Sequence, residues 1–255
     1  MTPRLASLVF AFGLAVSAAL AAPAGRAEAL RLVTGNDNAP HTDQSLPEGG
    51  VATDIVRQAF AAAGRDVSVE FLPWARGYLV TREGDYDATF PYLRTPERER
   101  EFLFSRPLLE TRQMLFSAPR AKLTGRSLDE LRGRIACTPN GYALPAEFAP
   151  MLSSGNLSVD RRSDLATCLR RVAAGRNDFV VLDEVLGRAA MAEAAVPAEA
   201  VVVVPAPVQG IALHLIVSRQ RPEGAALIAE FDRGLAALRS SGAYERILKR
   251  HLPGG

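Results

Sequence analysis

Short apolar runs alternate with longer amphipathic stretches along most of this chain. Residues 30–34 and 67–71 alternate as half-buried strands do, whereas residues 53–63 carry apolar side chains at helical spacing. Another helix is predicted from residue 73 to residue 82, and a short buried strand follows at residues 87–90. The order strand, helix, strand, helix, strand is typical of an α/β sheet with parallel strands.

Local signals mark where two of the helices begin. Thr53 or Asp54 is expected to cap the first helix, and Thr95 followed by Pro96 predicts the start of another. Arg98 falls in the first turn of that helix, beside the end of a strand. Its planar guanidinium offers paired donors that match a carboxylate, so the segment is a candidate anion site.

A second α/β series begins near residue 134. Its predicted strands and helices occupy residues 134–138, 145–152, 157–159, 164–175, 179–182, 184–195 and 201–204. Apolar runs near residues 113–118 and 211–218 are long enough to cross between the two series. The pattern from residue 223 to residue 251 is helical and is broken near residues 240–242.

These elements predict an α/β protein of two similar lobes joined by two hinge-crossing strands. Lobe 1 is expected to comprise residues 30–117 and 216–255, and lobe 2 residues 118–215. The first lobe is thus interrupted by the second and completed by the C-terminal helices. A cleft between two lobes linked in this way can close around a small molecule.

The first 29 residues have the composition of a secretory signal peptide. Arg4 precedes an apolar run over residues 5–22, and residues 27–29 offer small side chains at a cleavage site. Residues 19–21 form a second possible cleavage site, and an uncleaved membrane anchor is the alternative interpretation. Because no cysteine follows the apolar run, we expect a soluble periplasmic protein without a lipid anchor.

Composition excludes several classes of function. Removal of residues 1–29 would leave about 226 residues, enough for one large domain or two small lobes. The formal charge is +2, and basic and acidic residues are mixed, so nucleic acid is not an expected partner. We find no glycine-rich phosphate loop and no metal-ligand spacing of Cys or His, and therefore predict no cofactor and no metal. No homo-oligomer is expected either.

The chain has two cysteines, Cys137 and Cys168. Cys137 lies in a predicted strand and Cys168 in a predicted helix, and packing of one on the other would bring them within bridging range. Since cysteine pairs in oxidising compartments are usually bridged, we expect a disulfide. The alternative is two buried thiols that act as small apolar side chains.

Several short motifs in order resemble a known family. They are Gly84-Asp85-Tyr86-Asp87-Ala88, Thr95-Pro96-Glu97-Arg98, Phe102-Leu103-Phe104-Ser105-Arg106-Pro107, Leu131-Arg132-Gly133, Gly175-Arg176-Asn177-Asp178 and Gly242-Ala243-Tyr244-Glu245-Arg246-Ile247. Each is weak alone, but their order and spacing are specific. Nearly all of the chain after the apolar segment resembles the periplasmic solute-binding proteins of polar amino-acid ABC importers, bacterial extracellular solute-binding protein family 3.

The resemblance implies a two-lobed periplasmic-binding-protein-like fold of type II and a role in binding rather than catalysis. It also implies that Arg98 pairs with a ligand carboxylate and that Asp183 receives a ligand ammonium group. The implied partners are a small-molecule ligand and a membrane ABC permease. For Arg98 the alternative is a surface arginine, and for Asp183 it is a helix N-cap, a role it could combine with binding.

Further site candidates come from aromatic and polar residues near the expected cleft. They are Trp74, Tyr92, Arg94, Tyr142 and His41. Where the family usually carries a Gly and a Ser that bind the ammonium group, this chain has the sequence of residues 90–94, which contains Pro91. Together with Tyr142 after Gly141 and His41 after Pro40, where the family usually carries other residues, this departure allows a larger, more aromatic or less zwitterionic ligand than a plain α-amino acid.

Two other functions remain open on the same fold. Some relatives of the family are periplasmic dehydratases of cyclohexadienyl acids, and Arg98, His41, Glu110 and Asp183 could provide acid and base groups for such a reaction. The chain could also be a ligand-sensing module that contacts a membrane receptor instead of a permease.

Overall fold

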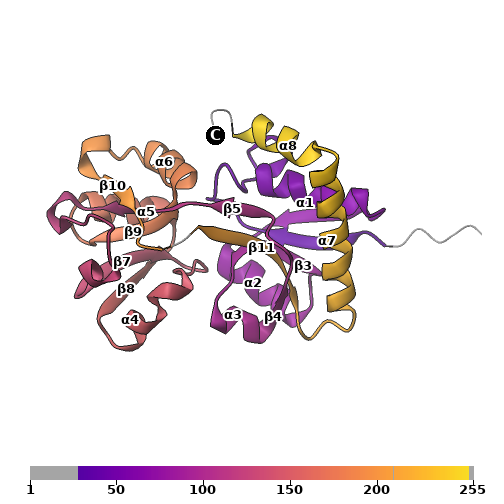
Figure 1. Ribbon diagram of the computed structural model, residues 1–255, viewed down its shortest axis with the longest axis horizontal. Helices are drawn as coiled ribbons and strands as arrows, with labels where there is room; N and C mark the ends of the chain where they lie inside the picture. Colours follow the sequence, from indigo (N-terminus) through magenta and orange to yellow (C-terminus); the bar gives the residue numbers. More distant parts are fainter. Residues whose placement is uncertain (1–27, 209, 253–255) are drawn as a thin grey trace, which may run out of the picture.

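The computed structural model describes residues 28–208 and 210–252. It has two lobes side by side, each built on one β-sheet with helices packed against it (Figure 1). The predicted α/β fold of two lobes is therefore confirmed. All but the last two residues of the predicted signal peptide lie outside the described residues. Within the described ranges, no helix has the length and apolar character needed to cross a membrane.

The sheet of lobe 1 has the strand order β2-β1-β3-β11-β4, and β5 also pairs with β11. Its strands are β1 (Leu30–Thr34), β2 (Val67–Phe71), β3 (Ala88–Leu93), β4 (Phe102–Phe104), β5 (Leu109–Thr111) and β11 (Ile211–Ser218). Its helices are α1 (Val51–Ala62), α2 (Trp74–Glu83), α3 (Pro96–Glu101), α7 (Gly224–Ser240) and α8 (Ala243–His251). Strands β1, β2 and β3 are parallel, whereas β11 runs antiparallel to its neighbours.

The sheet of lobe 2 repeats this plan with the strand order β10-β6-β9-β7-β8. Its strands are β6 (Gln113–Ser117), β7 (Arg134–Pro139), β8 (Leu157–Arg162), β9 (Phe179–Asp183) and β10 (Val202–Pro205). Its α-helices are α4 (Ala149–Ser153), α5 (Leu165–Ala173) and α6 (Glu184–Glu193). Strands β7, β8 and β9 are parallel, and β6 is antiparallel to β9 and β10. Short 3₁₀ turns complete both lobes at Pro47–Gly49, Pro119–Ala121, Leu128–Leu131, Ala146–Phe148 and Ala198–Ala200.

The chain crosses between the lobes at two places. The first crossing lies between β5, which pairs with β11 in lobe 1, and β6, which belongs to the sheet of lobe 2. The second lies between β10 and β11 (Figure 1). This differs from the predicted division, which assigned residues 113–117 to lobe 1 and residues 211–215 to lobe 2. An apolar run predicts a strand but does not indicate which sheet the strand joins.

Helix α1 begins earlier than predicted, and neither Thr53 nor Asp54 is its N-cap. The cap position is Gly50, whose φ of +97° favours glycine. The Thr53 hydroxyl instead donates to the carbonyl of Gly49, the residue before the N-cap, at 2.9 Å. Asp54 is buried and accepts hydrogen bonds from Arg250 at 3.1 Å and from His251 at 2.9 Å. Two residues with the chemistry of helix caps are thus used inside the helix.

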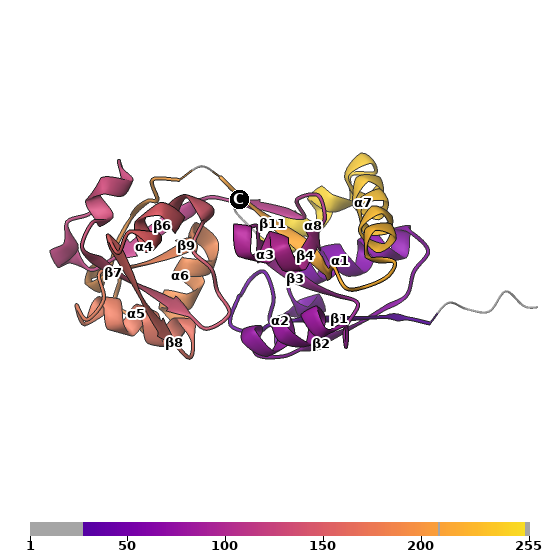
Figure 2. The same ribbon diagram turned by 90° about the horizontal axis from the view of Figure 1, so that it is seen from below.

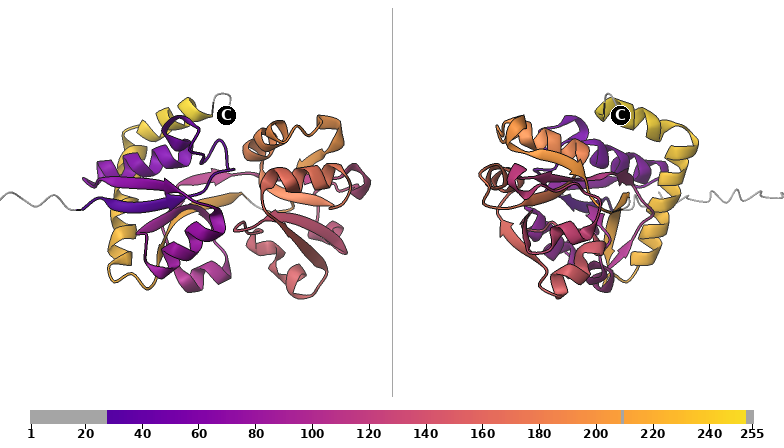
Figure 3. Two further views of the ribbon diagram at one scale, coloured as in Figure 1. Left: turned by 180° about the vertical axis from the view of Figure 1, so that it is seen from behind. Right: turned by 60° about the vertical axis from the view of Figure 1, so that its left-hand side comes forward.

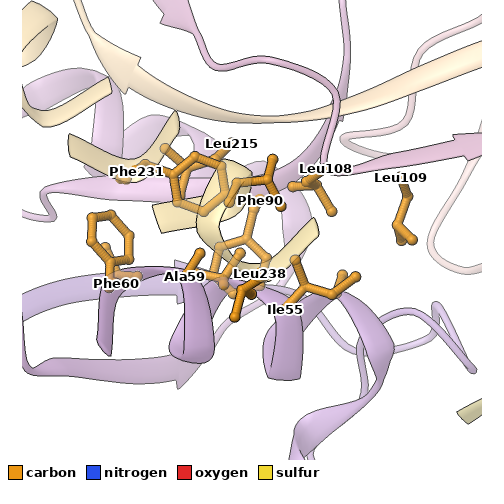
Figure 4. Close-up of a cluster of buried hydrophobic side chains, with 14 of the residues drawn as sticks. Ile55, Ala59, Phe60, Phe90, Leu108, Leu109, Leu215, Phe231 and Leu238 are labelled. Carbon is orange, nitrogen blue, oxygen red and sulfur yellow. The ribbon is translucent and has the colours of Figure 1, made fainter. Parts of the chain in front are cut away.

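Helices α1 and α7 pack on one face of the sheet of lobe 1 and form its core there, while α2 covers the other face (Figure 2). The Phe60 and Phe231 rings lie 5.3 Å apart between these helices (Figure 4). Gly234 permits the close approach, because a Cβ there would lie 1.9 Å from the Ala59 carbonyl oxygen. Helix α8 then packs along α1 (Figure 3).

A disulfide links the sheet of lobe 2 to a helix on its surface. Cys137 on β7 and Cys168 on α5 are joined, with their Cα atoms 5.4 Å apart, and both residues are fully buried. The predicted disulfide is present, and the alternative of two free thiols is wrong. The bridge adds to the apolar face of α5, which also buries Leu165, Leu169 and Val172.

Candidate functional site

A cavity of about 80 Å³ lies between the two lobes. Residues of lobe 1 on its walls include Asn38, His41, Trp74, Pro91, Tyr92, Leu93, Arg98 and Leu213. Residues of lobe 2 on its walls include Gly141, Tyr142, Ala143, Val181, Leu182, Asp183 and Leu186. The walls therefore come from loops and strand ends of both sheets, where ligands of α/β proteins usually bind.

His41 is held in the cavity wall by the N-terminus of helix α1. The first amides of a helix have no partner within it. Here the Val51 amide donates to the Pro40 carbonyl at 3.0 Å, and the Ala52 amide donates to the His41 carbonyl at 2.9 Å. A Cβ at Gly50 would lie 2.5 Å from the His41 carbonyl oxygen, so glycine is required there for space as well as for conformation. The helix thereby fixes the loop that carries the imidazole.

His41 and Asp183 join the two lobes directly. The His41 Nε2 atom lies 2.9 Å from Asp183 Oδ2, and both side chains are buried. Asp183 ends β9 and caps α6, because its Oδ1 accepts a hydrogen bond from the Leu186 amide at 3.0 Å. Burial would raise the pKa of Asp183, but His41 and the amides at the start of α6 outweigh it and hold the pKa below the usual range. Asp183 is therefore an ionised carboxylate with both oxygens engaged.

Arg98 is a buried cation without an acidic partner. Thr95 caps helix α3 as predicted and accepts the Arg98 amide at 3.3 Å, which places the side chain at the cavity. Its guanidinium donates to the Leu93 carbonyl at 3.1 Å and, across the lobes, to the Gly141 carbonyl at 2.9 Å. No carboxylate of a described residue lies within 4.0 Å of it. Desolvation lowers the pKa of Arg98, which is only 8% exposed.

Three aromatic rings line the cavity around this arginine. The Arg98 guanidinium lies 4.7 Å from the centre of the Tyr92 ring, at a distance typical of cation–π contacts. Trp74 makes edge contacts with Tyr92 and Tyr142, with ring centres 5.7 and 5.8 Å apart. Tyr142 belongs to lobe 2, and its hydroxyl donates to the Asp37 carbonyl of lobe 1 at 3.1 Å. The rings provide an apolar enclosure in which charged groups interact strongly.

The structure thus brings six of the seven predicted site residues to one cavity: Arg98, Asp183, Trp74, Tyr92, Tyr142 and His41. Arg94 is the exception, because it lies over the Phe104 ring and pairs with Glu99 at 2.9 Å, outside the cavity. It follows Leu93, the last residue of β3, so its direction depended on where that strand ended. Asn38 and Gln113 line the cavity but were not predicted, since neither belongs to a motif. Among the described residues, no cluster of three or more His, Cys, Asp or Glu side chains is arranged to hold a metal ion.

Comparison with known protein families shows which family the chain belongs to. The profile described as bacterial extracellular solute-binding proteins, family 3, matches residues 30–254. The chain belongs to this family. A solute-binding role and the predicted resemblance are thereby supported over the whole described fold.

Solved structures with the same fold differ widely in sequence. A histidine kinase sensor domain similar to periplasmic binding proteins has a TM-score of 0.73 and 23% identity over 89% of this chain and 97% of its own. An ancestral arginine-binding protein bound to arginine has a TM-score of 0.70 and 19% identity over 88% and 98% of the two chains. An ancestral amino acid-binding protein, a precursor of cyclohexadienyl dehydratase, has a TM-score of 0.66 and 21% identity over 87% and 94% of the two chains. Comparison with curated protein sequences gives no match.

Replacing Gly141 by alanine is expected to keep the lobes apart. Gly141 has a φ of +85°, and a Cβ there would lie 2.6 Å from Trp74 Cβ on the opposite lobe. Such overpacking costs about 1 to 3 kcal/mol, and it would weaken the closed form by that amount. Small-angle scattering should therefore report a larger radius of gyration for Gly141→Ala. Gly155→Ala is the matched control, because its φ is +72° and no atom lies within 4 Å of its Cβ position. Equal radii for the two variants would contradict this interpretation.

The contribution of Asp183 to stability is expected to disappear at acidic pH. A carboxyl group whose pKa is lowered in the folded state stabilises that state above its unfolded pKa, which is about 3.9 for aspartate. This stabilisation is lost as the pH falls below that value through the folded-state pKa. The difference in melting temperature between the wild type and Asp183→Asn should therefore shrink as the pH falls below about pH 4. A difference that persists unchanged at pH 3 would show that Asp183 acts by packing alone.

Proposed function

We propose that this protein captures a small, carboxylate-bearing solute between its lobes in the periplasm and delivers it to an ABC permease. One observation carries the proposal: Arg98 is buried at the cavity between the lobes and has no acidic partner among the described residues. A buried charge without a counter-ion is costly, and a ligand carboxylate would supply both the charge and the hydrogen-bond acceptors that the guanidinium fits.

The contacts between the lobes explain how binding would be coupled to closure. Arg98, His41 and the loop before His41 each reach lobe 2 through a hydrogen bond, to Gly141, Asp183 and Tyr142 respectively. A ligand on Arg98 would touch groups of both lobes at once and would therefore favour the closed form over the open one. A permease would then distinguish the closed, ligand-bound protein from the open, empty protein.

A thermal-shift screen of organic acids and amino acids, each paired with its carboxamide, tests the binding part of this proposal. A true ligand raises the melting temperature by mass action, and its carboxamide should not, because it lacks the charge that Arg98 requires. Transport is tested separately, by uptake of the labelled ligand in cells with and without the gene. Binding without a change in uptake would support the sensing module instead, the role of the kinase domain that has the same fold.

Catalysis is the second candidate, because the His41–Asp183 pair is an acid–base pair in the cavity wall. The dehydratase-precursor fold and this pair together justify one assay, incubation with prephenate or arogenate followed by product analysis. Formation of product would show that the protein is a dehydratase, and the proposed binding function would be replaced by catalysis. Glu110 is exposed and lies outside this cavity, but it lines a neighbouring groove together with His41 and Asp183.

A further inference from the structure

We infer that the ligand is a carboxylate that carries no amino group and has an uncharged hydroxyl or carbonyl oxygen in its place. This inference rests on the proposed function, because it assumes that Arg98 binds the carboxylate. It assigns His41 as the residue that determines specificity against amino acids.

The first reason is that both oxygens of the acidic group facing the cavity already accept hydrogen bonds from the protein. Asp183 is the one carboxylate among the described residues that line the cavity. Its Oδ2 is bound by His41 at 2.9 Å and its Oδ1 by the Leu186 amide at 3.0 Å. With 6% of its surface exposed, it has little room for a further donor. A ligand ammonium would have to displace a buried, charge-assisted hydrogen bond.

The second reason is that the nearby backbone acceptors are also engaged. The Leu93 and Gly141 carbonyls, which border the cavity, both accept from Arg98. An ammonium group in this enclosure would therefore lie beside the Arg98 cation without a free anion to compensate for the loss of water. Burying a charge in that way is strongly unfavourable. An uncharged oxygen substituent avoids this cost.

The third reason is that the cavity wall holds polar atoms suited to an uncharged partner. The His41 Nδ1 atom and the Tyr92 hydroxyl are buried, and neither has a hydrogen bond of normal geometry. Because His41 Nε2 shares its proton with Asp183, Nδ1 accepts from a hydroxyl in the neutral imidazole and donates to a carbonyl in the imidazolium. The Tyr92 hydroxyl, which has the buried Thr89 hydroxyl as a neighbour, can donate or accept. Buried polar groups normally find partners, and a hydroxyl or carbonyl oxygen matches both of these.

Compounds with one carbon skeleton and different substituents test the inference. Calorimetric titrations would compare alanine, lactate and pyruvate; glutamate, 2-hydroxyglutarate and 2-oxoglutarate; and phenylalanine, phenyllactate and phenylpyruvate. In the series that binds, we expect the hydroxy or oxo acid to bind at least tenfold more tightly than the amino acid. An amino acid that binds most tightly, with binding lost in Arg98→Ala, would overturn this inference and leave the proposed function standing. If no acid binds in a manner that depends on Arg98, both are overturned.

A change of specificity gives a second, independent test. His41→Ala frees Asp183 for a ligand ammonium, so affinity for the amino acid of the series should rise at least tenfold while affinity for the hydroxy or oxo acid falls. The double variant His41→Ala/Asp183→Asn should lose the gain, because the freed carboxylate is then absent. Arg76→Ala serves as the control, since Arg76 is exposed on α2 and does not line the cavity. A His41→Ala protein that is folded and still discriminates against the amino acid would contradict the role given to His41.

Discussion

Replacing Arg98 by alanine is expected to abolish the rise in melting temperature that a carboxylate ligand produces. Truncating one member of a buried, hydrogen-bonded charge pair costs about 2 to 5 kcal/mol, which corresponds to a loss of affinity of about thirtyfold or more. The variant also loses the hydrogen bond from Arg98 to the Gly141 carbonyl, so closure itself becomes less favourable. Titration calorimetry and thermal shift with the ligand from the screen measure both effects.

Two further variants separate charge from geometry at this position. Arg98→Lys keeps the positive charge but loses the planar pair of donors, so an intermediate affinity is expected. Arg76→Ala removes an exposed arginine from the neighbouring helix α2 and should leave binding unchanged. The assignment of Arg98 is wrong if Arg98→Ala still shows a full ligand-induced shift. It is incomplete if Arg98→Lys binds as well as the wild type, because the carboxylate would then need only a charge.

Much of the fold could be predicted because its signals are local. Strands β1 and β2 have the predicted bounds, and Thr95 and Pro96 begin helix α3 as their chemistry indicates. Predictions failed where a distant contact decided the outcome. Thr53 and Asp54 have the chemistry of caps, but Gly50 and the loop before it set the start of α1. Asp54 instead accepts a hydrogen bond from His251 in the C-terminal helix α8.

The candidate site shows the same difference between local signals, which could be predicted, and distant contacts, which could not. Arg98 could be identified because it stands in a motif, Asp183 because the family resemblance implies its role, and the aromatic residues because they flank the expected cleft. The pairing of His41 with Asp183 could not be predicted, since the residues are 142 positions apart and belong to different lobes. The resemblance to the family implied that Asp183 is a partner for a ligand ammonium group. The contact with His41 occupies Asp183, and it is the observation from which we propose a different class of ligand.

Loss of the disulfide is expected to destabilise lobe 2 by about 3 to 4 kcal/mol, because a cross-link of this span removes loop-closure entropy from the unfolded chain. The bridge joins residues 31 positions apart, Cys137 on β7 and Cys168 on α5. For a protein of this size, that change corresponds to a fall of about 6 to 16 °C in the melting temperature. The paired variant Cys137→Ser/Cys168→Ser tests the effect in calorimetry or circular dichroism. This variant also places two hydroxyl groups in a fully buried apolar cluster. The stability that it loses is therefore an upper limit for the contribution of the disulfide.

The variant Cys137→Ala/Cys168→Ala and reduction of the wild type separate the cross-link from this burial effect. The alanine pair adds no polar group, and the reduced wild type keeps both sulfur atoms in the core. If the cross-link stabilises the fold, both should melt several degrees below the oxidised protein, and reductant should lower neither cysteine-free variant further. Binding at 25 °C should be retained in all of them, since neither cysteine lines the cavity between the lobes. Equal melting temperatures for the oxidised and reduced wild type would show that packing around α5, with Leu165, Leu169 and Val172, holds lobe 2 together without the bond.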